Sequence, residues 1–387
     1  MSSPAPSPLP PKHDFGTRLD RFWRRVTEGL ELNQLWSQFR SDTRASYRFY
    51  SKEIDSSRTS EMGRGRRFLY LTEQFFWAVL EKLTPARRIL LLIALLLLLI
   101  GGGFSANKDN GHVEFFYLNT HFYGGVLMFL LLMLEIGDRV IMKRDLQIAK
   151  EIQQWLLPAT PPNVPGMEVA FVTRPANTVA GDFYDIFPRS GPSGSDGSWL
   201  MAVADVAGKS MPAALLMASF QASLKTLSTT NVSLTDLAAG MNRYACTNSQ
   251  QGRRFTTAFL GEYTPETRML SYINAGHNNP MLRRAGGQLE RLEAGGIPLG
   301  ILDEAVYQSA SVTLHPGDWL VIFTDGVIEA ENEAAQEYGE DRLITMVNAG
   351  MALTPAQMLQ QIMADLDRFV ATTPQHDDIT CMLIKAV

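Results

Sequence analysis

Three aspartates stand where apolar, strand-like runs begin or end, and this pattern limits how the chain can fold. They are Asp205 in MAVADV, Asp325 in VIFTDG and Asp377 in PQHDDIT. Each one alone is compatible with an ordinary turn, because Asp is a common turn residue. If sheets bring the three sites together, the carboxylates repel one another unless cations neutralise them. A fourth acid, Asp182, lies in the apolar and aromatic stretch VAGDFYDIF.

The residue types in this pattern favour hard divalent cations. Carboxylates without a His or Cys cluster suit Mg²⁺ or Mn²⁺ better than Zn²⁺, and the two cysteines, Cys246 and Cys381, form no CxxC pair. Two such ions about 3.5–4 Å apart can hold a hydroxide at neutral pH and stabilise an in-line displacement at phosphorus. The sequence has no Walker-type glycine loop and no serine nucleophile elbow. The pattern therefore predicts a hydrolase that uses water as the nucleophile.

Short strands, turn dipeptides and a few helices are predicted after Gly166. A buried strand at 201–204 ends at Asp205, and Pro212 is expected to open a helix that Ser210 caps. Two antiparallel hairpins are expected, formed by 255–263 with 269–274 and by 306–314 with 319–324. Helices are expected at 341–347 and 355–370, before a last strand at 379–385. Interleaved hairpins with clustered helices predict an α+β fold rather than a βαβ repeat.

Six motifs in this region resemble, in order and spacing, those of the bacterial SpoIIE/RsbU branch of the PPM (type-2C-like) protein phosphatases. They are GDFYD (181–185), VADVAGKSMPAALLMA (203–218), NAGHNNPML (274–282), GIPLGI (296–301), FTDGVIEA (323–330) and HDDIT (376–380). LQIAKEIQQWLLP also resembles the helix that precedes the catalytic domain in that branch. The resemblance covers residues 147–387 and implies a β-sandwich of two antiparallel sheets flanked by helices, an α-β-β-α arrangement.

The resemblance implies a role for each acid. Asp205 matches the acid that bridges two metal ions, and the carbonyl of Val206 matches the backbone ligand beside it. Asp325 and Asp377 match acids on the first metal. Asp182 matches an acid that reaches the second metal directly or through water. The four aspartates are the implied catalytic residues, all five residues are implied metal ligands, and two Mn²⁺ or Mg²⁺ ions are the implied cofactors.

Three neighbouring residues have alternative interpretations. Asp378 follows Asp377, and because neighbours on a strand point to opposite faces, only one should be a primary ligand; Asp377 is expected to be that one. Asp185 is open to either a metal contact or a hydrogen-bonding role at the edge of the site. His277, in a loop rich in Gly and Asn, is expected to fix that loop through hydrogen bonds rather than act as a general acid.

Two uncharged runs, 89–106 and 115–134, predict a transmembrane helical hairpin. Arg and Lys at both outer flanks predict that the chain on either side is cytoplasmic, in a multi-pass protein of the inner membrane with two helices. For the second run, a buried core helix or a re-entrant segment is the alternative. The residues before Ile89 hold 16 Lys and Arg against 10 Asp and Glu, a balance that suits anionic lipid or nucleic acid. No nucleic-acid-binding motif accompanies it, so no nucleic-acid partner is expected.

These patterns divide the chain into four parts. They are a basic and aromatic N-terminal cytoplasmic region (1–85), the transmembrane hairpin (86–136), a linker helix (137–158) and the PPM-type phosphatase domain (159–387). The N-terminal region can be read either as amphipathic helices at the inner leaflet or as a small helical bundle. In the linker, Ile141, Ile148 and Trp155 recur every seven residues. This spacing is open to a homodimer through the linker helix or to packing on its own domain.

The function implied by the resemblance is that of a membrane-anchored, metal-dependent serine/threonine phosphatase. Its substrate would be phosphoserine or phosphothreonine on a bacterial regulatory protein, typically a STAS-type anti-sigma-factor antagonist, attacked by a metal-bridging hydroxide. The alternative is a catalytically silent pseudophosphatase that binds a phosphoprotein at the membrane. All of the matched acids are present, which favours the enzyme.

Overall fold

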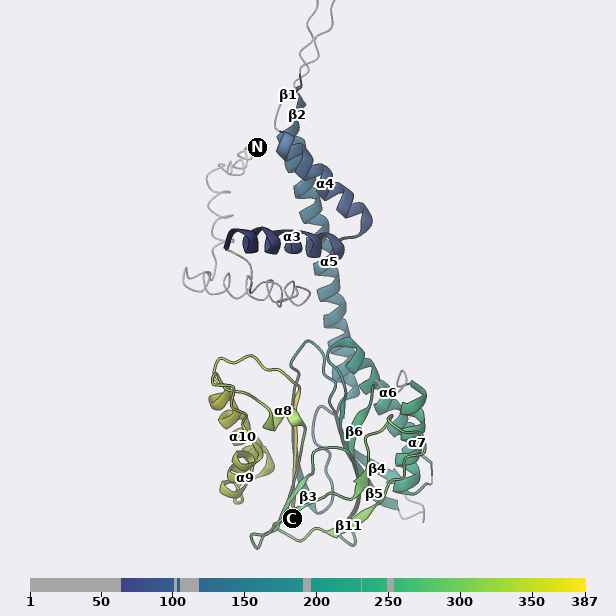
Figure 1. The fold of residues 1–387 in the computed structure, drawn as a ribbon. Coiled ribbons are helices and arrows are strands. Elements are labelled where there is room, and N and C mark those ends of the chain that lie inside the picture. Colours follow the sequence, from purple (N-terminus) through teal and green to yellow (C-terminus); the bar gives the residue numbers. More distant parts are fainter. Residues whose placement is uncertain (1–63, 101–102, 105–117, 191–195, 231, 249–253) are drawn as a thin grey trace, which may run out of the picture. The chain divides into compact units, whose positions relative to one another are not determined.

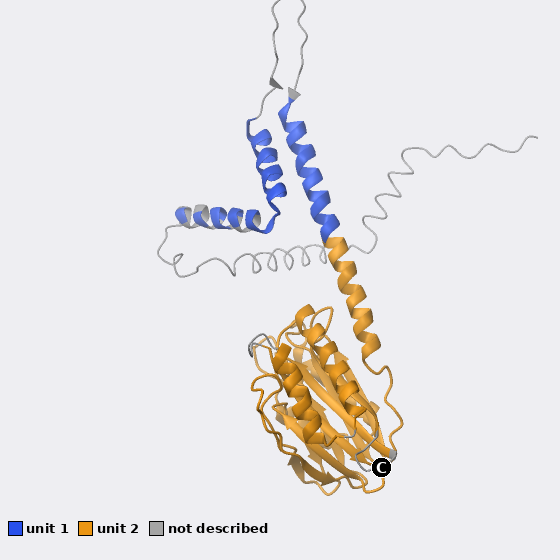
Figure 2. Ribbon diagram, turned by 90° about the vertical axis from the view of Figure 1, so that its right-hand side faces the viewer, with its two compact units in different colours: residues 1–138 blue, residues 139–387 orange. Residues whose placement is uncertain are grey.

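The computed structural model describes residues 64–100, 103–104, 118–190, 196–230, 232–248 and 254–387, and the expectations for residues 1–63 lie outside them. The chain divides into two compact units, residues 1–138 and residues 139–387 (Figure 2). The described elements of the first unit are α3 (Arg64–Lys82), α4 (Pro85–Ile100), the short strands β1 (Gly103–Phe104) and β2 (Leu118–Asn119), and the first part of α5 (Thr120–Leu156).

The predicted transmembrane hairpin, and with it the location in the inner membrane, is wrong for the described part of the chain. None of its helices is both long enough and apolar enough to span a bilayer. Helix α4 has 16 residues, about 24 Å at 1.5 Å per residue, whereas the hydrocarbon layer is about 30 Å thick. Helix α5 continues beyond its apolar part into Glu135 and Asp138, which both pair with Arg87. Parts of both predicted runs, 101–102 and 105–117, lie outside the described residues.

The second unit is a sandwich of two sheets with helices on both outer faces (Figure 1). One sheet has the strand order β10-β7-β6-β5-β4, with β11 also on β7, and the other has the order β3-β13-β12-β8-β9. The strands of the first sheet are β4 (Phe183–Ser190), β5 (Asp196–Val206), β6 (Thr256–Thr264), β7 (Met269–Ala275), β10 (Gly295–Gly296) and β11 (Ala310–Thr313). Those of the second are β3 (Met167–Arg174), β8 (Met281–Arg283), β9 (Leu289–Arg291), β12 (Trp319–Phe323) and β13 (Ile379–Ala386).

The helices complete a four-layer arrangement, as the α+β prediction requires. Helices α6 (Met211–Ser228) and α7 (Leu234–Asn248) cover the six-stranded sheet, while α9 (Glu340–Ala349) and α10 (Pro355–Val370) cover the five-stranded sheet. A short helix, α8 (Asp325–Ile328), follows β12. Among the described strands, every pairing is antiparallel apart from the two-residue pairing of β10 with β7. The prediction of antiparallel sheets flanked by helices is confirmed.

Strand β5 shows why its sequence is a continuous apolar run. Leu200, Ala202 and Ala204 pack in the core under α6 and α7, whereas Met201 and Val203 pack in the core between the two sheets. Successive strand residues point to opposite faces, so a strand that is buried on both faces has apolar residues at every position instead of alternating apolar and polar residues. The first acid after this run, Asp205, stands where the strand reaches the edge of the core.

The two predicted hairpins have different outcomes. The first is confirmed, because β6 and β7 pair in antiparallel register from Ala258 opposite Ala275 to Thr264 opposite Met269. The second is wrong, because β11 pairs with β7 in one sheet whereas β12 pairs with β8 and β13 in the other. The turn between β11 and β12 is therefore a crossover between sheets. Asp318 stabilises it by accepting the backbone N–H of His315 at 3.0 Å.

Candidate active site

The four predicted acids come from neighbouring strands of the two sheets. Asp182 directly precedes β4, and Asp205 lies near the end of β5, its antiparallel neighbour. Asp325 opens α8 directly after β12, and Asp377 precedes β13, which pairs with β12. Burial, followed by the charges of Asp325 and Asp377, raises the pKa of Asp205 to about 7. Acids that are far apart in sequence therefore act on one another as a cluster.

Asp182 connects the two sheets. Its side chain is only 1% exposed, and the hydroxyl of Thr324, at the end of β12, donates a 2.9 Å hydrogen bond to its Oδ2. The same hydroxyl oxygen accepts the backbone N–H of Thr380 at 3.0 Å. Burial and the neighbouring charge of Asp205 raise the pKa of Asp182 well above its usual range. A carboxylate in this position is costly unless a cation or a proton neutralises it.

Two glycines bring the acids close together. A Cβ at Gly326 would overlap the carbonyl oxygen of Asp378, so the Asp325–Gly326 pair packs directly on the backbone that follows Asp377. A Cβ at Gly181 would lie 3.1 Å from the carbonyl oxygen of Val206, tighter than most such contacts. The glycine beside each acid is therefore needed for close backbone approach.

Asp377 and Asp378 have different surroundings, although they are adjacent. Asp378 accepts the backbone N–H of Ala176 on Oδ1 at 2.7 Å and that of Gly181 on Oδ2 at 2.6 Å. Asp377 has a side chain 40% exposed, with Oδ2 at 2.9 Å from Nζ of Lys209. Asp378 thus holds the loop before Asp182, and Asp377 is the acid that faces the opening.

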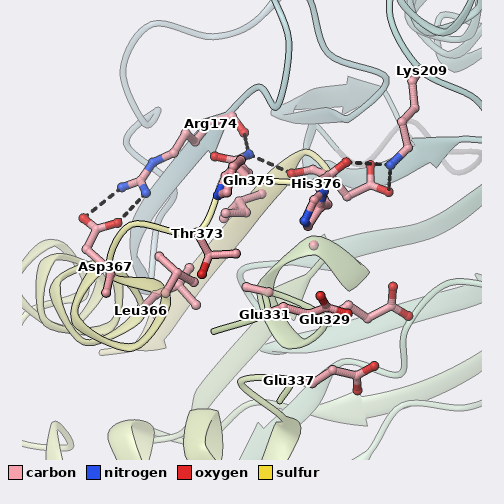
Figure 3. Close-up of a pocket in the computed structure, with 17 residues that line it drawn as sticks. Arg174, Lys209, Glu329, Glu331, Glu337, Leu366, Asp367, Thr373, Gln375 and His376 are labelled. Carbon is pink, nitrogen blue, oxygen red and sulfur yellow. Dashed lines mark hydrogen bonds and ion pairs between the residues drawn. The ribbon is translucent and has the colours of Figure 1, made fainter. Parts of the chain in front are cut away.

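Lys209 is the residue of the site that the sequence reasoning missed. Its ammonium group pairs with Asp377 and also donates a 2.6 Å hydrogen bond to the carbonyl of His376 (Figure 3). Lys209 lies in the VADVAGKSMPAALLMA motif, but only the fold brings it next to Asp377, 168 positions further along the chain. The expected cap at the next residue is wrong, because Ser210 has φ 64 and makes no side-chain hydrogen bond to the start of α6.

Asp185 and His277 play structural parts. Oδ2 of Asp185 lies 2.6 Å from Nζ of Lys225, so this acid ties β4 to α6. His277 is buried, its Nδ1 lies 3.1 Å from the hydroxyl of Thr257, and its backbone N–H donates to Asn274 Oδ1 at 2.7 Å. Burial lowers the pKa of His277 to about 4, so the ring is neutral at physiological pH. These contacts agree with a histidine that fixes its loop.

The site has the donor chemistry for divalent metal ions, although the side chains are not gathered around one point. Within the described ranges, no group of three or more His, Cys, Asp or Glu side chains is arranged to hold a metal. One carboxylate oxygen of Asp377 pairs with Lys209, and one of Asp182 accepts a hydrogen bond from Thr324. The buried carboxylates nevertheless repel one another, and a hard cation would relieve that repulsion. The residues present therefore fit such ions.

A cavity of about 410 Å³ opens beside Asp377 and Lys209 (Figure 3). Arg174 on its wall is paired with Asp367, and the side-chain amide of Gln375 donates to the carbonyls of Arg174 and Asp377 at 2.7 Å. Its polar and charged lining side chains are Arg174, Lys209, Glu329, Glu331, Glu337, Asp367, Thr373, Gln375, His376 and Asp377. Its volume lies within the range of ligand-binding pockets, about 300–1,000 Å³.

Comparisons with known proteins identify the fold and the family of the domain. The family model described as stage II sporulation protein E (SpoIIE) matches residues 195–387. The chain is 26% identical over 276 residues to Protein IcfG of Synechocystis sp., covering 65% of this chain and 42% of that protein. It is 27% identical over 250 residues to Phosphoserine phosphatase RsbU of Bacillus subtilis, covering 64% of this chain and 72% of RsbU. The SiaA-PP2C domain of Pseudomonas aeruginosa has the same fold, with a TM-score of 0.56 at 20% identity over 64% of this chain and 98% of that domain.

The fold is that of PP2C-type domains. The match to the SpoIIE model and the similarity to Phosphoserine phosphatase RsbU identify a PPM-type protein phosphatase. Residues 195–387, the part of the chain that matches the model, belong to the SpoIIE family. The chain spans less than half of the length of IcfG and about three quarters of that of RsbU.

Proposed function

We propose that this protein hydrolyses phosphoserine or phosphothreonine on a regulatory protein in a metal-dependent reaction. The observation that carries the proposal is the close packing of the segments that bear the acids. Gly326, beside Asp325, packs on the backbone of Asp378, and Thr324 at the end of β12 donates to Asp182 of the other sheet. The pKa of Asp205, raised to about 7 by burial and then by neighbouring carboxylates, agrees with this packing. Perturbed carboxyl groups in a shared site beside an open cavity are typical of catalytic centres. The name of RsbU, a phosphoserine phosphatase, supports the same reaction class.

Two divalent ions, Mn²⁺ or Mg²⁺, would be held by Asp182, Asp205, Asp325, Asp377 and the carbonyl of Val206. When bound, such ions activate water and offset the charge of the phosphoryl group. The protein's own contribution is orientation: Asp205 near the end of β5 lies beside Gly181, which precedes Asp182, and the charges of Asp325 and Asp377 raise its pKa after burial. Thr324 fixes the rotamer of Asp182, and Asp378 holds the loop that carries it.

We propose further that the substrate is a phosphorylated regulator of the STAS type and that the protein acts as a homodimer. The substrate class rests on the resemblance to the SpoIIE/RsbU branch, and the cavity beside Asp377 and Lys209 is where we place the phosphorylated residue. The dimer rests on exposed apolar residues of α5 with heptad spacing: Ile141, Ile148 and Trp155, the last 80% exposed. Exposed apolar stripes of this spacing are typical of helix pairing.

One observation favours a second function, that of a silent phosphoprotein-binding domain. Lys209 occupies Asp377 and so withholds one carboxylate from a metal ion. A protein in which this pair persisted would bind phosphate without hydrolysing it. The two functions differ in turnover, which one experiment can measure.

The test is hydrolysis of p-nitrophenyl phosphate and of a phosphoserine protein by the full chain with Mn²⁺, Mg²⁺ or a chelator. We expect turnover with metal, and its loss both on chelation and in Asp205→Asn. Asp341→Asn, an exposed acid on α9, is the matched control and should retain wild-type turnover. Turnover that survives chelation and Asp205→Asn would contradict the proposal, and phosphoprotein binding without turnover would support the silent domain.

A further inference from the structure

The imidazole ring of His277 lies between the two sheets of the sandwich. His277 stands in the crossover from β7 of one sheet to β8 of the other, and only 5% of it is exposed. Its Nδ1 lies 3.1 Å from the hydroxyl oxygen of Thr257 on β6. The carbonyl of Phe323, at the end of β12, is close enough to the ring to raise its pKa against the larger effect of burial. One ring therefore reaches a strand of each sheet.

In the six-stranded sheet, the ring contacts the strand neighbour of Asp205. Thr257 stands directly opposite Asp205 in the antiparallel pairing of β5 with β6, and its hydroxyl lies 3.5 Å from the carbonyl oxygen of Asp205. Asp205 continues the row of Met201 and Val203, whose side chains pack in the core between the sheets. Opposed residues on paired strands share a face, so Thr257 also faces the second sheet.

In the five-stranded sheet, the ring lies beside the backbone that leads to Asp325. Phe323 is followed by Thr324, whose hydroxyl donates to Asp182 at 2.9 Å, and then by Asp325. This short segment therefore carries one proposed metal ligand and holds another. His277 lies between it and the strand pair that carries Asp205.

The loop that carries His277 is itself fixed by a buried side chain. Oδ1 of Asn274, at the end of β7, accepts the backbone N–H of His277 at 2.7 Å, and Nδ2 of Asn274 donates to the carbonyl of His277 at 3.0 Å. Asn274 is only 3% exposed, so water does not compete for these bonds. With its backbone held on both sides, the ring has a set position between the sheets.

We propose that His277 is a positioning residue for the metal site: its ring sets the separation between Asp205 on one sheet and Asp325 on the other. The part of this inference that concerns metal and turnover rests on the proposed function. Residues that orient metal ligands through hydrogen bonds change metal affinity by about 10- to 100-fold when they are substituted. His277 acts one step further back, through Thr257 and the backbone of β12, and we expect about a 5- to 10-fold effect.

The experiment compares the full-length wild-type protein with His277→Leu, His277→Asn, Thr257→Val and Thr256→Val. His277→Asn keeps a polar atom near the place of Nδ1 and loses the rest of the ring, so it should fall between wild type and His277→Leu. Thr256→Val is the matched control, because it makes the same change one residue earlier, where the side chain faces α6 and α7. The readouts are Mn²⁺ affinity by calorimetry, urea unfolding of the metal-free protein, and kcat at limiting and saturating Mn²⁺.

In His277→Leu we expect Mn²⁺ affinity about 5- to 10-fold weaker and a lower kcat that saturating Mn²⁺ restores. Thr257→Val should shift the affinity in the same direction. The double variant should bind Mn²⁺ about as well as His277→Leu alone, because both changes break the same contact. Thr256→Val should have the Mn²⁺ affinity of wild type.

Unchanged Mn²⁺ affinity in folded His277→Leu, with only a lower free energy of unfolding, would overturn the inference, because His277 would then only stabilise the fold. If His277→Leu does not fold, the Mn²⁺ affinity of Thr257→Val decides. Metal-dependent turnover by wild type with equal Mn²⁺ affinities in all variants would overturn the positioning role and leave the proposed function intact. Shifted affinities without turnover by wild type would contradict the proposed function and leave the positioning role intact.

Discussion

The ammonium nitrogen of Lys209 lies 2.9 Å from Oδ2 of Asp377. Lys209 is in the loop between β5 and α6, and Asp377 is in the segment before β13. A cation of the protein therefore occupies a carboxylate that the proposed metal ions require. Lys209 also reduces the repulsion within the acid cluster, since its charge lowers the pKa of Asp325 against the larger effect of burial. If Asp377 binds a metal ion through Oδ2, that ion competes with the Lys209 ammonium group for this oxygen.

The first prediction concerns that competition. Lys209→Met removes the cation that competes for Asp377 and leaves the acids without a counter-charge, so Mn²⁺ affinity should rise by about 3- to 10-fold. Calorimetry on the chelator-treated protein measures it. Lys209→Arg keeps the charge and should resemble wild type. Weaker Mn²⁺ binding by Lys209→Met would show that Lys209 supports the metal site rather than competes for it.

The second prediction separates the adjacent acids. Asp377→Asn should weaken Mn²⁺ binding at least about 10-fold and leave the metal-free protein as stable as wild type, because its ion pair is solvent-exposed. Asp378→Asn removes one of two acceptors for buried or partly buried N–H groups and should lower the free energy of unfolding by about 1–3 kcal/mol. Urea unfolding and calorimetry on both variants give the comparison. If Asp378→Asn weakened Mn²⁺ binding and Asp377→Asn did not, Asp378 would be the metal ligand.

The third prediction tests the part that Asp185 plays. Because Asp185 pairs with Lys225 on α6, Asp185→Asn should change Mn²⁺ affinity by less than about 3-fold, whereas Asp182→Asn should change it at least about 10-fold. Metal titration of both variants at equal ionic strength measures this. A loss of Mn²⁺ affinity in Asp185→Asn equal to that in Asp182→Asn would place Asp185 in the metal site.

The fourth prediction follows from the buried His277. Burial lowers its pKa from 6.5 to about 4, so the unfolded chain takes up a proton as pH falls below 6.5 while the folded protein does not. Stability from this group is complete above pH 6.5 and is lost as pH falls toward 4. Between about pH 7.5 and about pH 5 the loss should be about 2 kcal/mol.

The measurement is the unfolding free energy of wild type minus that of His277→Gln at each pH. Taking this difference removes the contribution of groups common to both proteins, including the acids with raised pKa values. The difference should shrink by about 2 kcal/mol on acidification. A difference independent of pH would mean that His277 binds a proton equally well in the folded state.

Much of this site could be predicted because the signals are local. The run before Asp205 is apolar at every position, which is how a strand buried on both faces must read, and Asp205 stands at its end. The β6–β7 hairpin has a short polar turn between two apolar strands, and its register follows from that turn. The choice of Asp377 over its neighbour came from strand alternation and stays a prediction until metal binding is measured.

The rest depended on contacts that local signals do not contain. The 306–324 segment has the same apolar–turn–apolar pattern as a hairpin, but its halves pair with different sheets, because β12 fits between β8 and β13. The apolar runs 89–106 and 115–134 predict membrane spans by composition, yet among the described helices none is both long enough and apolar enough to span a bilayer. Lys209 and His277 contact residues far along the chain, and only the fold shows their partners.

The central claim is that two divalent ions bind between the acids of the two sheets. The most direct measurement is a crystal structure of the protein soaked in Mn²⁺, with the ions located by their anomalous scattering. We expect two anomalous peaks about 3.5–4 Å apart, both beside Asp205, with Asp377 released from Lys209. Peaks elsewhere, or Asp205 without a metal while Lys209 still holds Asp377 at saturating Mn²⁺, would contradict it.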